Sequence, residues 1–462
     1  MLIEPTDNLP LARSTFVGAV FPAVAQTPAA ALLAVQYQLT QSERLAPDAL
    51  RRLQFRQIGQ LVAHIDRCVP HYGLSLRRVG IDPRTAITPQ AWARVPVLTR
   101  NQLQVAGPAL FSTETPAGHG KVGSTTTSGS SGRPVALRKT ELAQFYWQCF
   151  TLREELWHRR DLSAKLMSIR RDGALEPGAA TGQLRREADW GAPTATVYPT
   201  GPAVLLDYRC TVQQQAEALE RERPGYLATF PSLLLELLRT GVQPLGLREV
   251  RTVGEALSDE TRVVCQERWR VPVTDLYSAG EAGVIAIQCP EHGSYHVQSE
   301  SVLVEVLRDD GTACEPGETG QVVLTPLHNF AMPLLRYAID DLAEVGRPCA
   351  CGRTLPVLAR IPGKARGMLV LADGSRRFPY YGHNALMKVD AILQHQVVQR
   401  TLDEVELSLV LRRQLTPDEE RYLIDSAQRA LGAPFRVTLR VRDAIERGPG
   451  GKYAEFYSDV AG

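Results

Sequence analysis

Lysine is scarce in this sequence of 462 residues, although basic side chains in general are not. Lysine and arginine together number 52 against 50 acidic residues, and only six of the 52 are lysines. The formal charge is +2 and no basic block stands out, which argues against a surface for nucleic acid or for an anionic membrane. In a chain so biased toward arginine, each remaining lysine is a residue of interest. The six are Lys121, Lys139, Lys165, Lys364, Lys388 and Lys452.

The sequence also shows neither the pattern of a secretory signal nor that of a membrane-spanning segment. Residues 1–10 contain no basic stretch that leads into an apolar core, so we expect no secretory signal. Residues 21–35 are apolar, but Pro22 and Pro28 interrupt them and the stretch is too short to span a bilayer. The eight cysteines do not form the framework of a small secreted disulfide protein. We therefore expect a soluble cytoplasmic protein with neither a membrane nor a nucleic-acid partner.

The length allows a large core that is divided into at least two domains. Strand and helix signals alternate over residues 226–277, which predicts α/β architecture with a largely parallel sheet. Residues 284–335 carry strand signals alone and predict a smaller β-subdomain. After a short polar run at 363–367, strands and one helix predict a small, mobile α+β domain. The predicted domains are therefore 1–362, with mostly parallel sheets plus the β-subdomain, and 363–462.

Four local signals can be compared with a structure. Apolar residues recur at helical spacing over 50–65, which predicts an amphipathic helix that ends before Pro70. A second helix is predicted over 141–158. Ser232 and Ser258 each precede an apolar or acidic run, so we expect both to cap helix N-termini.

The most distinctive stretch is STTTSGSSGRP at residues 124–134. Its glycines allow tight turns that bring backbone N–H groups to an anion, and its hydroxyls add short donors. Arg133 supplies a fixed cation. The spacing is not that of a Walker loop, which needs G-x-x-x-x-G-K-[ST]. The stretch therefore predicts a loop for a triphosphate tail, and a flexible Ser/Gly linker is the alternative.

Three further motifs follow this loop in order. They read YSAGEAG at 277–283, RYAIDDL at 336–342 and PGGK at 449–452. Together with the loop they resemble the ordered core motifs of adenylate-forming enzymes. Within that group the chain is most similar to phenylacetate–CoA ligases, because it also contains VPHYG, VPVLTRNQL, CPEHGSYH and CACGRTLP. The resemblance extends over nearly the whole chain, from residue 69 to residue 452.

The resemblance implies a reaction and its substrates. A small acid, of which an aromatic acid fits the family tendency, would react with ATP and Mg²⁺ to give acyl-AMP and pyrophosphate. The acyl group would then pass to CoA. Because an anion attacks a polyanion, catalysis needs cations and oriented N–H groups around the phosphorus. Three alternatives stay open: transfer to an amine or carrier protein, activation of an oxyacid such as nitrite, and a catalytically lapsed nucleotide- or zinc-binding scaffold. A homodimer is compatible with the sequence.

The resemblance also assigns residues to the nucleotide. Glu281 matches the acid that helps to hold Mg²⁺, which prefers carboxylate oxygens. Asp341 matches the acid that hydrogen-bonds the ribose hydroxyls. Lys364 stands where the hinge motif usually has arginine. The residues expected to bind the nucleotide are Thr126, Thr127, Ser128, Gly129, Ser130, Ser131, Gly132, Arg133, Gly254, Glu255, Ala256, Tyr277, Ser278, Asp341 and Lys364.

Lys452 is the residue that we expect to matter most for catalysis, because a flexible ammonium on a Gly-rich loop can neutralise charge at the α-phosphate. The resemblance implies that the small domain swings about Arg366, so that one site serves both steps. Two departures from the family pattern occur: Gly280 replaces a threonine, and residues 338–340 replace arginine, threonine and glycine. The predicted walls of the acid pocket are Phe145, Tyr146, Tyr198, Phe230, Ala279 and Gly280.

A C-x-x-H pair and a later C-x-C pair suggest a metal site. Two short-spaced pairs of soft ligands suit a four-coordinate structural zinc, and some phenylacetate–CoA ligase relatives carry such a site. His296 is the alternative histidine. We predict a zinc that staples the β-subdomain at about 284–360, whereas reduced thiols without metal are the alternative. The predicted ligands are Cys289, His292, Cys349 and Cys351.

Overall fold

The structure is a computed structural model that describes residues 11–126, 135–171, 184–364, 367–377, 379, 381–447 and 453–460. The chain divides into two compact units. The first unit comprises Met1–Lys165, Glu187–Ala203 and Asp275–Arg360. The second comprises Leu166–Arg186, Val204–Thr274 and Ile361–Gly462. The domain boundary predicted at 362/363 stays a prediction.

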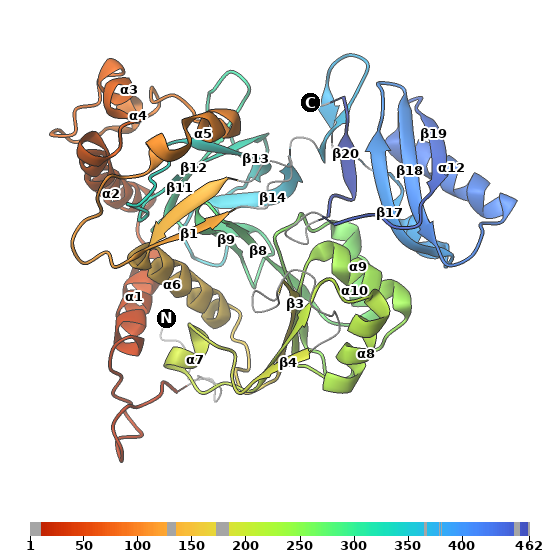
Figure 1. Cartoon of the computed structure of the whole chain (residues 1–462), viewed down its shortest axis with the longest axis horizontal. Coiled ribbons are helices and arrows are strands. Elements are labelled where there is room, and N and C mark those ends of the chain that lie inside the picture. The colour runs from red at the N-terminus through yellow and green to blue at the C-terminus, as the bar shows by residue number, and fades with distance from the viewer. Residues whose placement is uncertain are drawn as a thin grey trace. The chain divides into compact units, whose positions relative to one another are not determined.

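The first unit combines helices with a mainly antiparallel sheet (Figure 1). Its helices are α1 (Ala29–Ser42), α2 (Pro47–Cys68), α3 (Gly73–Arg78), α4 (Pro89–Trp92), α5 (Arg100–Ala106), the 3₁₀ helix η1 (Gly107–Leu110), α6 (Glu141–Trp157) and α7 (Thr194–Val197). Strands that lie wholly or partly in it are β1 (Val122–Thr126), β2 (Ala136–Thr140), β8 (Val273–Ala279), β9 (Gly283–Gln288), β10 (Tyr295–Val297), β11 (Val302–Leu307), β12 (Thr319–Pro326), β13 (Tyr337–Val345) and β14 (Val357–Lys364). Seven of these strands lie side by side in the order β11-β12-β13-β14-β10-β9-β8.

The two helices predicted in this unit are confirmed. On α2, Ile58, Leu61 and Ile65 are fully buried on one face, and the helix ends at Cys68, before Pro70. Helix α6 begins after Thr140, whose side-chain oxygen accepts the N–H of Ala143. This cap fixes the start of α6 directly after the β1–β2 hairpin.

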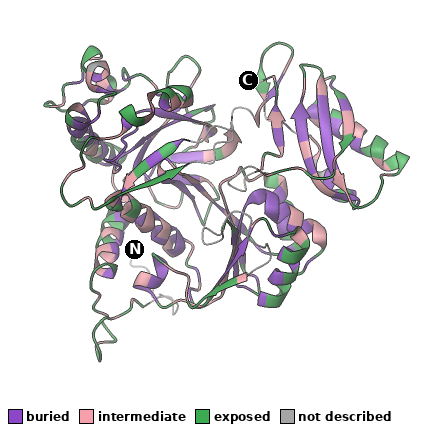
Figure 2. Cartoon of the chain, in the orientation of Figure 1, coloured by how far each residue is buried: buried purple, intermediate pink, exposed green. Residues whose placement is uncertain are grey.

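Strands β1 and β2 form an antiparallel hairpin, with Thr126 opposite Ala136 next to the connecting loop. Strand β1 is exposed along its whole length (Figure 2). Residues 127–134 connect the two strands and lie outside the described residues; the predicted phosphate-binding residues 127–133 are among them. The hairpin thus positions the residues on both sides of this segment.

Strands β8 and β9 form a second antiparallel hairpin, in which Ala279 lies opposite Gly283. The connection at 280–282 is a tight turn, and the N–H of Ala282 donates to the carbonyl of Ala279 over 3.2 Å. Gly283 has a φ of +83°, as glycine commonly has at the end of such a three-residue connection. This geometry places Glu281 at the tip of the hairpin.

The second unit contains five neighbouring strands of the large sheet, a two-stranded sheet and a four-stranded sheet, with their helices. Its helices are α8 (Val212–Glu222), α9 (Pro231–Thr240), α10 (Asp259–Trp269), α11 (His383–Lys388) and α12 (Pro417–Leu431). Its further strands are β3 (Leu166–Arg170), β4 (Leu184–Glu187), β5 (Ala203–Asp207), β6 (Tyr226–Thr229), β7 (Glu249–Val253), β15 (Leu369–Val370), β16 (Arg376–Arg377), β17 (Ile392–Gln399), β18 (Glu404–Leu411), β19 (Arg436–Val441) and β20 (Phe456–Ser458).

The α/β alternation predicted for 226–277 is confirmed in this unit. Strands β3, β6 and β7 are parallel, and α8, α9 and α10 separate or follow the strands along the chain. Ser258 caps α10 as predicted, since its Oγ accepts the N–H of Thr261 over 3.1 Å. The prediction for Ser232 is wrong. Phe230 takes the cap position and helix α9 begins at Pro231, two residues before the predicted start, because proline suits the first helical position, where no N–H is needed.

The C-terminal part of the second unit forms a four-stranded sheet in the order β19-β18-β17-β20. Helix α12 packs on β19 (Figure 1). The core between them contains the fully buried Val397, Val405 and Leu407, together with Leu431 from α12. The three strands and the helix predicted here are confirmed in their order as β15, β18, α12 and β19, whereas α11, β16, β17 and β20 were not predicted. Within the described ranges, no helix combines the length and the apolar character that crossing a bilayer requires.

Candidate active site

A buried acid lies near two cations in the first unit. Glu281, at the tip of the β8–β9 hairpin, is buried. The Nη1 of Arg100, the first residue of α5, lies 3.9 Å from Glu281 Oε1. The ammonium of Lys139, on β2, is also close enough to Glu281 for their charges to attract. Three elements that are far apart in sequence therefore bring opposite charges together at this point.

Tyr277 and Asp341 lie in the same neighbourhood. The Tyr277 hydroxyl, on β8, donates to Asp341 Oδ2, on β13, over 2.8 Å. Burial raises the pKa of Tyr277 well above its usual value, and the charges of Asp341 and Glu281 raise it further, so the phenol keeps its proton. The structure thus brings together Tyr277, Glu281 and Asp341, three residues that the motifs single out.

Asp340 explains one departure from the family pattern. It adopts a left-handed backbone conformation with φ +65°, a region that favours glycine. Aspartate tolerates this region better than most other residues. The family pattern has glycine at this position, and the backbone here adopts a conformation that suits glycine.

We expect replacement of Asp340 by glycine to keep or raise stability, by at most about 1 kcal/mol, because glycine relieves the left-handed strain. Alanine at the same position should lower the free energy of unfolding by about 1 kcal/mol relative to glycine. Thermal unfolding of Asp340→Gly and Asp340→Ala measures the difference. An alanine variant as stable as the glycine variant would contradict the assigned conformation.

A cleft opens beside Glu281. The empty space in and around the cleft, open solvent included, is about 330 Å³. The residues that line it include Lys139, Tyr146, Trp147, Glu281, His328 and Asn329. The rings of Tyr146 and His328 are stacked, with centroids 3.7 Å apart. Burial lowers the pKa of His328 to about 4, so this imidazole is neutral near pH 7. The cleft is therefore small and partly aromatic, with Lys139 as a cation in its lining.

The predicted pocket walls divide between this cleft and the hydrophobic cores. Tyr146 lines the cleft, and Ala279 and Gly280 adjoin Glu281 in the hairpin. Phe145 and Tyr198 instead pack in a core with α1, and Phe230 packs in the core of the second unit. Each of these three aromatic side chains packs in a hydrophobic core, and their role as pocket walls stays a prediction.

The predicted adenine-side residues 254–256 follow β7 in the second unit. Glu255 is buried and accepts hydrogen bonds from the N–H groups of Ser232, over 3.0 Å, and Tyr453, over 2.6 Å. Burial raises its pKa to about 7, although Arg447 Nη1, 3.9 Å away, opposes the rise. Protein donors thus already contact both Glu255 oxygens, and a role of these residues toward adenine stays a prediction.

The remaining predicted nucleotide residues are placed as follows. Thr126 is the last residue of β1 and is exposed, and Ser278 lies on β8 opposite Val284. Lys364 ends β14. The predicted residues outside the described part of the chain are Thr127, Ser128, Gly129, Ser130, Ser131, Gly132, Arg133, Arg366 and Lys452.

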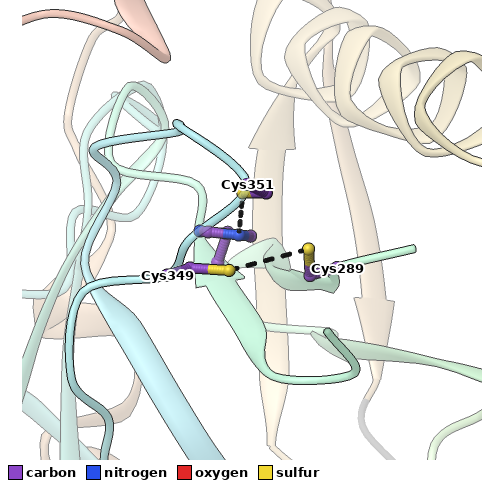
Figure 3. Close-up of side chains that lie close together, drawn as sticks. Cys289, Cys349 and Cys351 are labelled. Carbon is purple, nitrogen blue, oxygen red and sulfur yellow. Dashed lines mark hydrogen bonds between the residues drawn. The ribbon is translucent and has the colours of Figure 1, made fainter. Parts of the chain in front are cut away.

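A cluster of soft ligands lies elsewhere in the first unit (Figure 3). Cys349 Sγ lies 3.8 Å from Cys289 Sγ, and Cys351 Sγ lies 3.3 Å from the Nε2 of His296. The four ligand atoms all lie within 4.8 Å of one another. Ligands at about 2.3 Å from a tetrahedral zinc would be roughly 3.8 Å apart, so the donor set fits this metal. The histidine of the cluster is the alternative His296, on β10, whereas His292 lies on an exposed turn.

Sequence reasoning gave no role to Arg100 or Lys139. Arg100 belongs to the stretch VPVLTRNQL, and Lys139 is one of only six lysines, so both carried a signal. No spacing rule relates either residue to Glu281, because the three lie on different elements that only the fold brings together.

Comparison with known proteins agrees with this architecture. No family model matches the sequence. The phenylacetate–CoA ligase of Thermus thermophilus is 27% identical over 388 residues, which cover 79% of this chain and 82% of that enzyme. The phenylacetate–CoA ligase of Pseudomonas putida is 24% identical over 444 residues, which cover 88% of this chain and 94% of that enzyme.

Among solved structures, 2-hydroxyisobutyryl-CoA ligase in the postadenylation state is similar in fold, with a TM-score of 0.70 at 18% identity. The match covers 91% of this chain and 92% of that structure. The predicted fold class is thereby confirmed. In sequence the chain is similar to phenylacetate–CoA ligases, and in fold it is similar to an adenylate-forming CoA ligase; it is phenylacetate–CoA ligase-like.

Proposed function

We propose that this chain activates a small carboxylic acid with ATP and then transfers the acyl group to CoA. The observation that supports the proposal best is the neighbourhood of Glu281, Tyr277 and Asp341, with Arg100 and Lys139 close to Glu281. Relatives of similar length act as phenylacetate–CoA ligases, which supports the same reaction class for this chain. An aromatic acid and a cytoplasmic location stay predictions.

In the first step a carboxylate oxygen of the acid attacks the α-phosphorus of ATP. The bond from that phosphorus to the bridging oxygen breaks, and pyrophosphate leaves with the electron pair. Glu281 would hold Mg²⁺, which supplies positive charge beside the phosphates. Asp341 would accept hydrogen bonds from the ribose hydroxyls, and the Tyr277 hydroxyl orients its carboxylate. Arg100 lies beside Glu281 and adds a fixed cation.

In the second step the sulfur of CoA attacks the acyl carbon. AMP leaves with the electron pair of the acyl–oxygen bond, and the thiol proton is lost to solvent. No residue of the chain is assigned to CoA, so the acceptor needs a direct test.

Product analysis separates this proposal from its rivals. Purified protein, ATP, Mg²⁺ and a panel of small acids, with nitrite included, would be incubated with CoA, with an amine or with hydroxylamine. We expect acid-dependent hydroxamate with hydroxylamine and acyl-CoA with CoA. An amide without thioester would favour transfer to an amine. ATP binding without any acid-dependent product would favour a lapsed scaffold and contradict the proposal.

We also propose that Cys289, His296, Cys349 and Cys351 hold one structural zinc. All four residues lie in the first unit, and all eight cysteines of the chain are free of disulfides. A metal at this point would tie the β9–β10 turn to the segment between β13 and β14. Thiolates are the form that binds zinc, so binding would also keep these cysteines deprotonated.

We expect the wild-type protein to hold about one zinc per chain. The double variant Cys349→Ser/Cys351→Ser should lose most of this zinc, because half of the donor set is removed. Its thermal unfolding temperature should fall. Elemental analysis of the purified protein measures the metal. Cys314→Ser is the matched control, since Cys314 lies outside the cluster and should keep the zinc. Wild-type protein without zinc, or a double variant that keeps it, would contradict the assignment.

A further inference from the structure

Lys139 is a half-buried lysine to which the reaction as described gives no role. Its Nζ lies 4.2 Å from the centroid of the Trp147 ring. Among the residues that the structure describes, none forms a side-chain hydrogen bond or an ion pair with it. Burial lowers the pKa of Lys139 to about 8, and the charge of Glu281 only partly opposes this. The protein thus holds a cation in surroundings that disfavour its charge.

This arrangement costs stability. A contact between an ammonium and an aromatic face stabilises the charge only modestly. Removing an ammonium from water without an ion-pair partner costs more free energy than this contact returns. A purely structural role therefore explains Lys139 poorly, whereas a binding site commonly retains a residue that costs stability.

The position of Lys139 indicates which anion it meets. It lines the cleft together with Glu281, Tyr146 and Trp147. In the hairpin it lies opposite Gly123, whereas the last described pair before the predicted phosphate-binding residues is Thr126 with Ala136. At about 3.4 Å per residue, Lys139 is roughly 10 Å along the strand from Ala136. This separation favours the acid over the β- and γ-phosphates as the partner of Lys139.

We propose that Lys139 binds a carboxylate oxygen of the acid substrate inside this cleft and thereby determines acid specificity. The proposal rests on the proposed function. The bound carboxylate is either the group that reacts or a second carboxylate on the same acid. Trp147 and Tyr146 would contact the apolar part of the acid.

The test is steady-state adenylation by Lys139→Met with matched monocarboxylic and dicarboxylic acids. Methionine has a similar length but no charge. Because a charge-assisted hydrogen bond is lost, we expect KM for the acid to rise about 10- to 100-fold, while KM for ATP changes by less than about twofold. A rise for both kinds of acid assigns Lys139 to the reacting carboxylate. A rise for dicarboxylic acids alone assigns it to the second one.

Three controls isolate the charge. Lys121→Met removes an exposed lysine just before the same hairpin and should leave both KM values unchanged. Lys139→Arg keeps the charge and should recover part of the acid affinity. Lys139→Met should unfold at the same or a higher temperature than wild type, since it removes a half-buried cation for which the described residues supply no ion pair.

Calorimetric titration of the acids in the presence of a non-hydrolysable ATP analogue separates this inference from the proposed function. If wild type binds acid but releases no pyrophosphate, the proposed function fails, and weaker binding by Lys139→Met still supports the inference. Unchanged acid affinity and unchanged acid KM in Lys139→Met would overturn it. An equal rise in KM for ATP, or a wild-type protein that binds none of the acids, would overturn it as well.

Discussion

Replacing Lys452 with alanine is expected to lower the rate of acyl-adenylate formation by about 10³-fold or more. The reaction brings a carboxylate to a polyanionic phosphate, so a single well-placed cation at the α-phosphate acts mainly on the transition state. Lys452 lies in the Gly-rich sequence GPGGKYAEF, and the resemblance of this motif predicts that its ammonium takes this role. Acid-dependent pyrophosphate release measures the rate. The zinc content and the unfolding temperature should stay at the wild-type values.

The matched control is Lys388→Ala. Lys388 is an exposed lysine at the end of α11, in the same unit of the protein, and the reaction gives it no role. Its loss should leave the rate unchanged. A Lys452→Ala variant with full adenylation activity would show that Lys452 does not act on the α-phosphate.

Replacing Glu281 with glutamine should have the second-largest effect, a fall in adenylation rate of about 10²-fold that excess Mg²⁺ partly reverses. The substitution preserves the shape of the side chain but removes the charge that a hard cation needs. It also removes the attraction to Arg100 and Lys139, which lie near this carboxylate. The rate is measured against Mg²⁺ concentration, with KM for the acid as a second parameter.

Glu315→Gln is the matched control, since Glu315 is an exposed acid of the same unit between β11 and β12. It should show the wild-type Mg²⁺ dependence. If Glu281→Gln has the wild-type Mg²⁺ dependence as well, Glu281 is not a metal ligand, and its buried position at the hairpin tip serves another purpose.

Much of the fold follows from local sequence patterns. The apolar spacing of α2 and the cap at Ser258 each depend on a few neighbouring residues, so the sequence alone places them well. Ser232 shows the limit of this reasoning. Both Pro231 and Ser232 favour a helix start, and the constraint of the proline ring determines which residue takes the first position.

The site residues that lie in a recognisable motif could be predicted from the sequence. The residues that meet only because distant elements pack together could not. Tyr277, Glu281 and Asp341 could be named because each lies in a recognisable motif. The closeness of Arg100 and Lys139 to Glu281 depends on how α5, β2 and the β8–β9 hairpin pack, which no local pattern encodes. The same reason explains the choice of His296. Spacing favours the C-x-x-H pair, but β10 carries His296 toward Cys351.

Isotope exchange between ATP and pyrophosphate is the sharpest test of acid activation by this protein, because it reports the reversal of adenylate formation without requiring CoA or any other acceptor. We expect exchange that needs both Mg²⁺ and one of a panel of small acids, and that Lys452→Ala abolishes. Exchange that proceeds without acid, or no exchange with any acid while ATP binds, would contradict it.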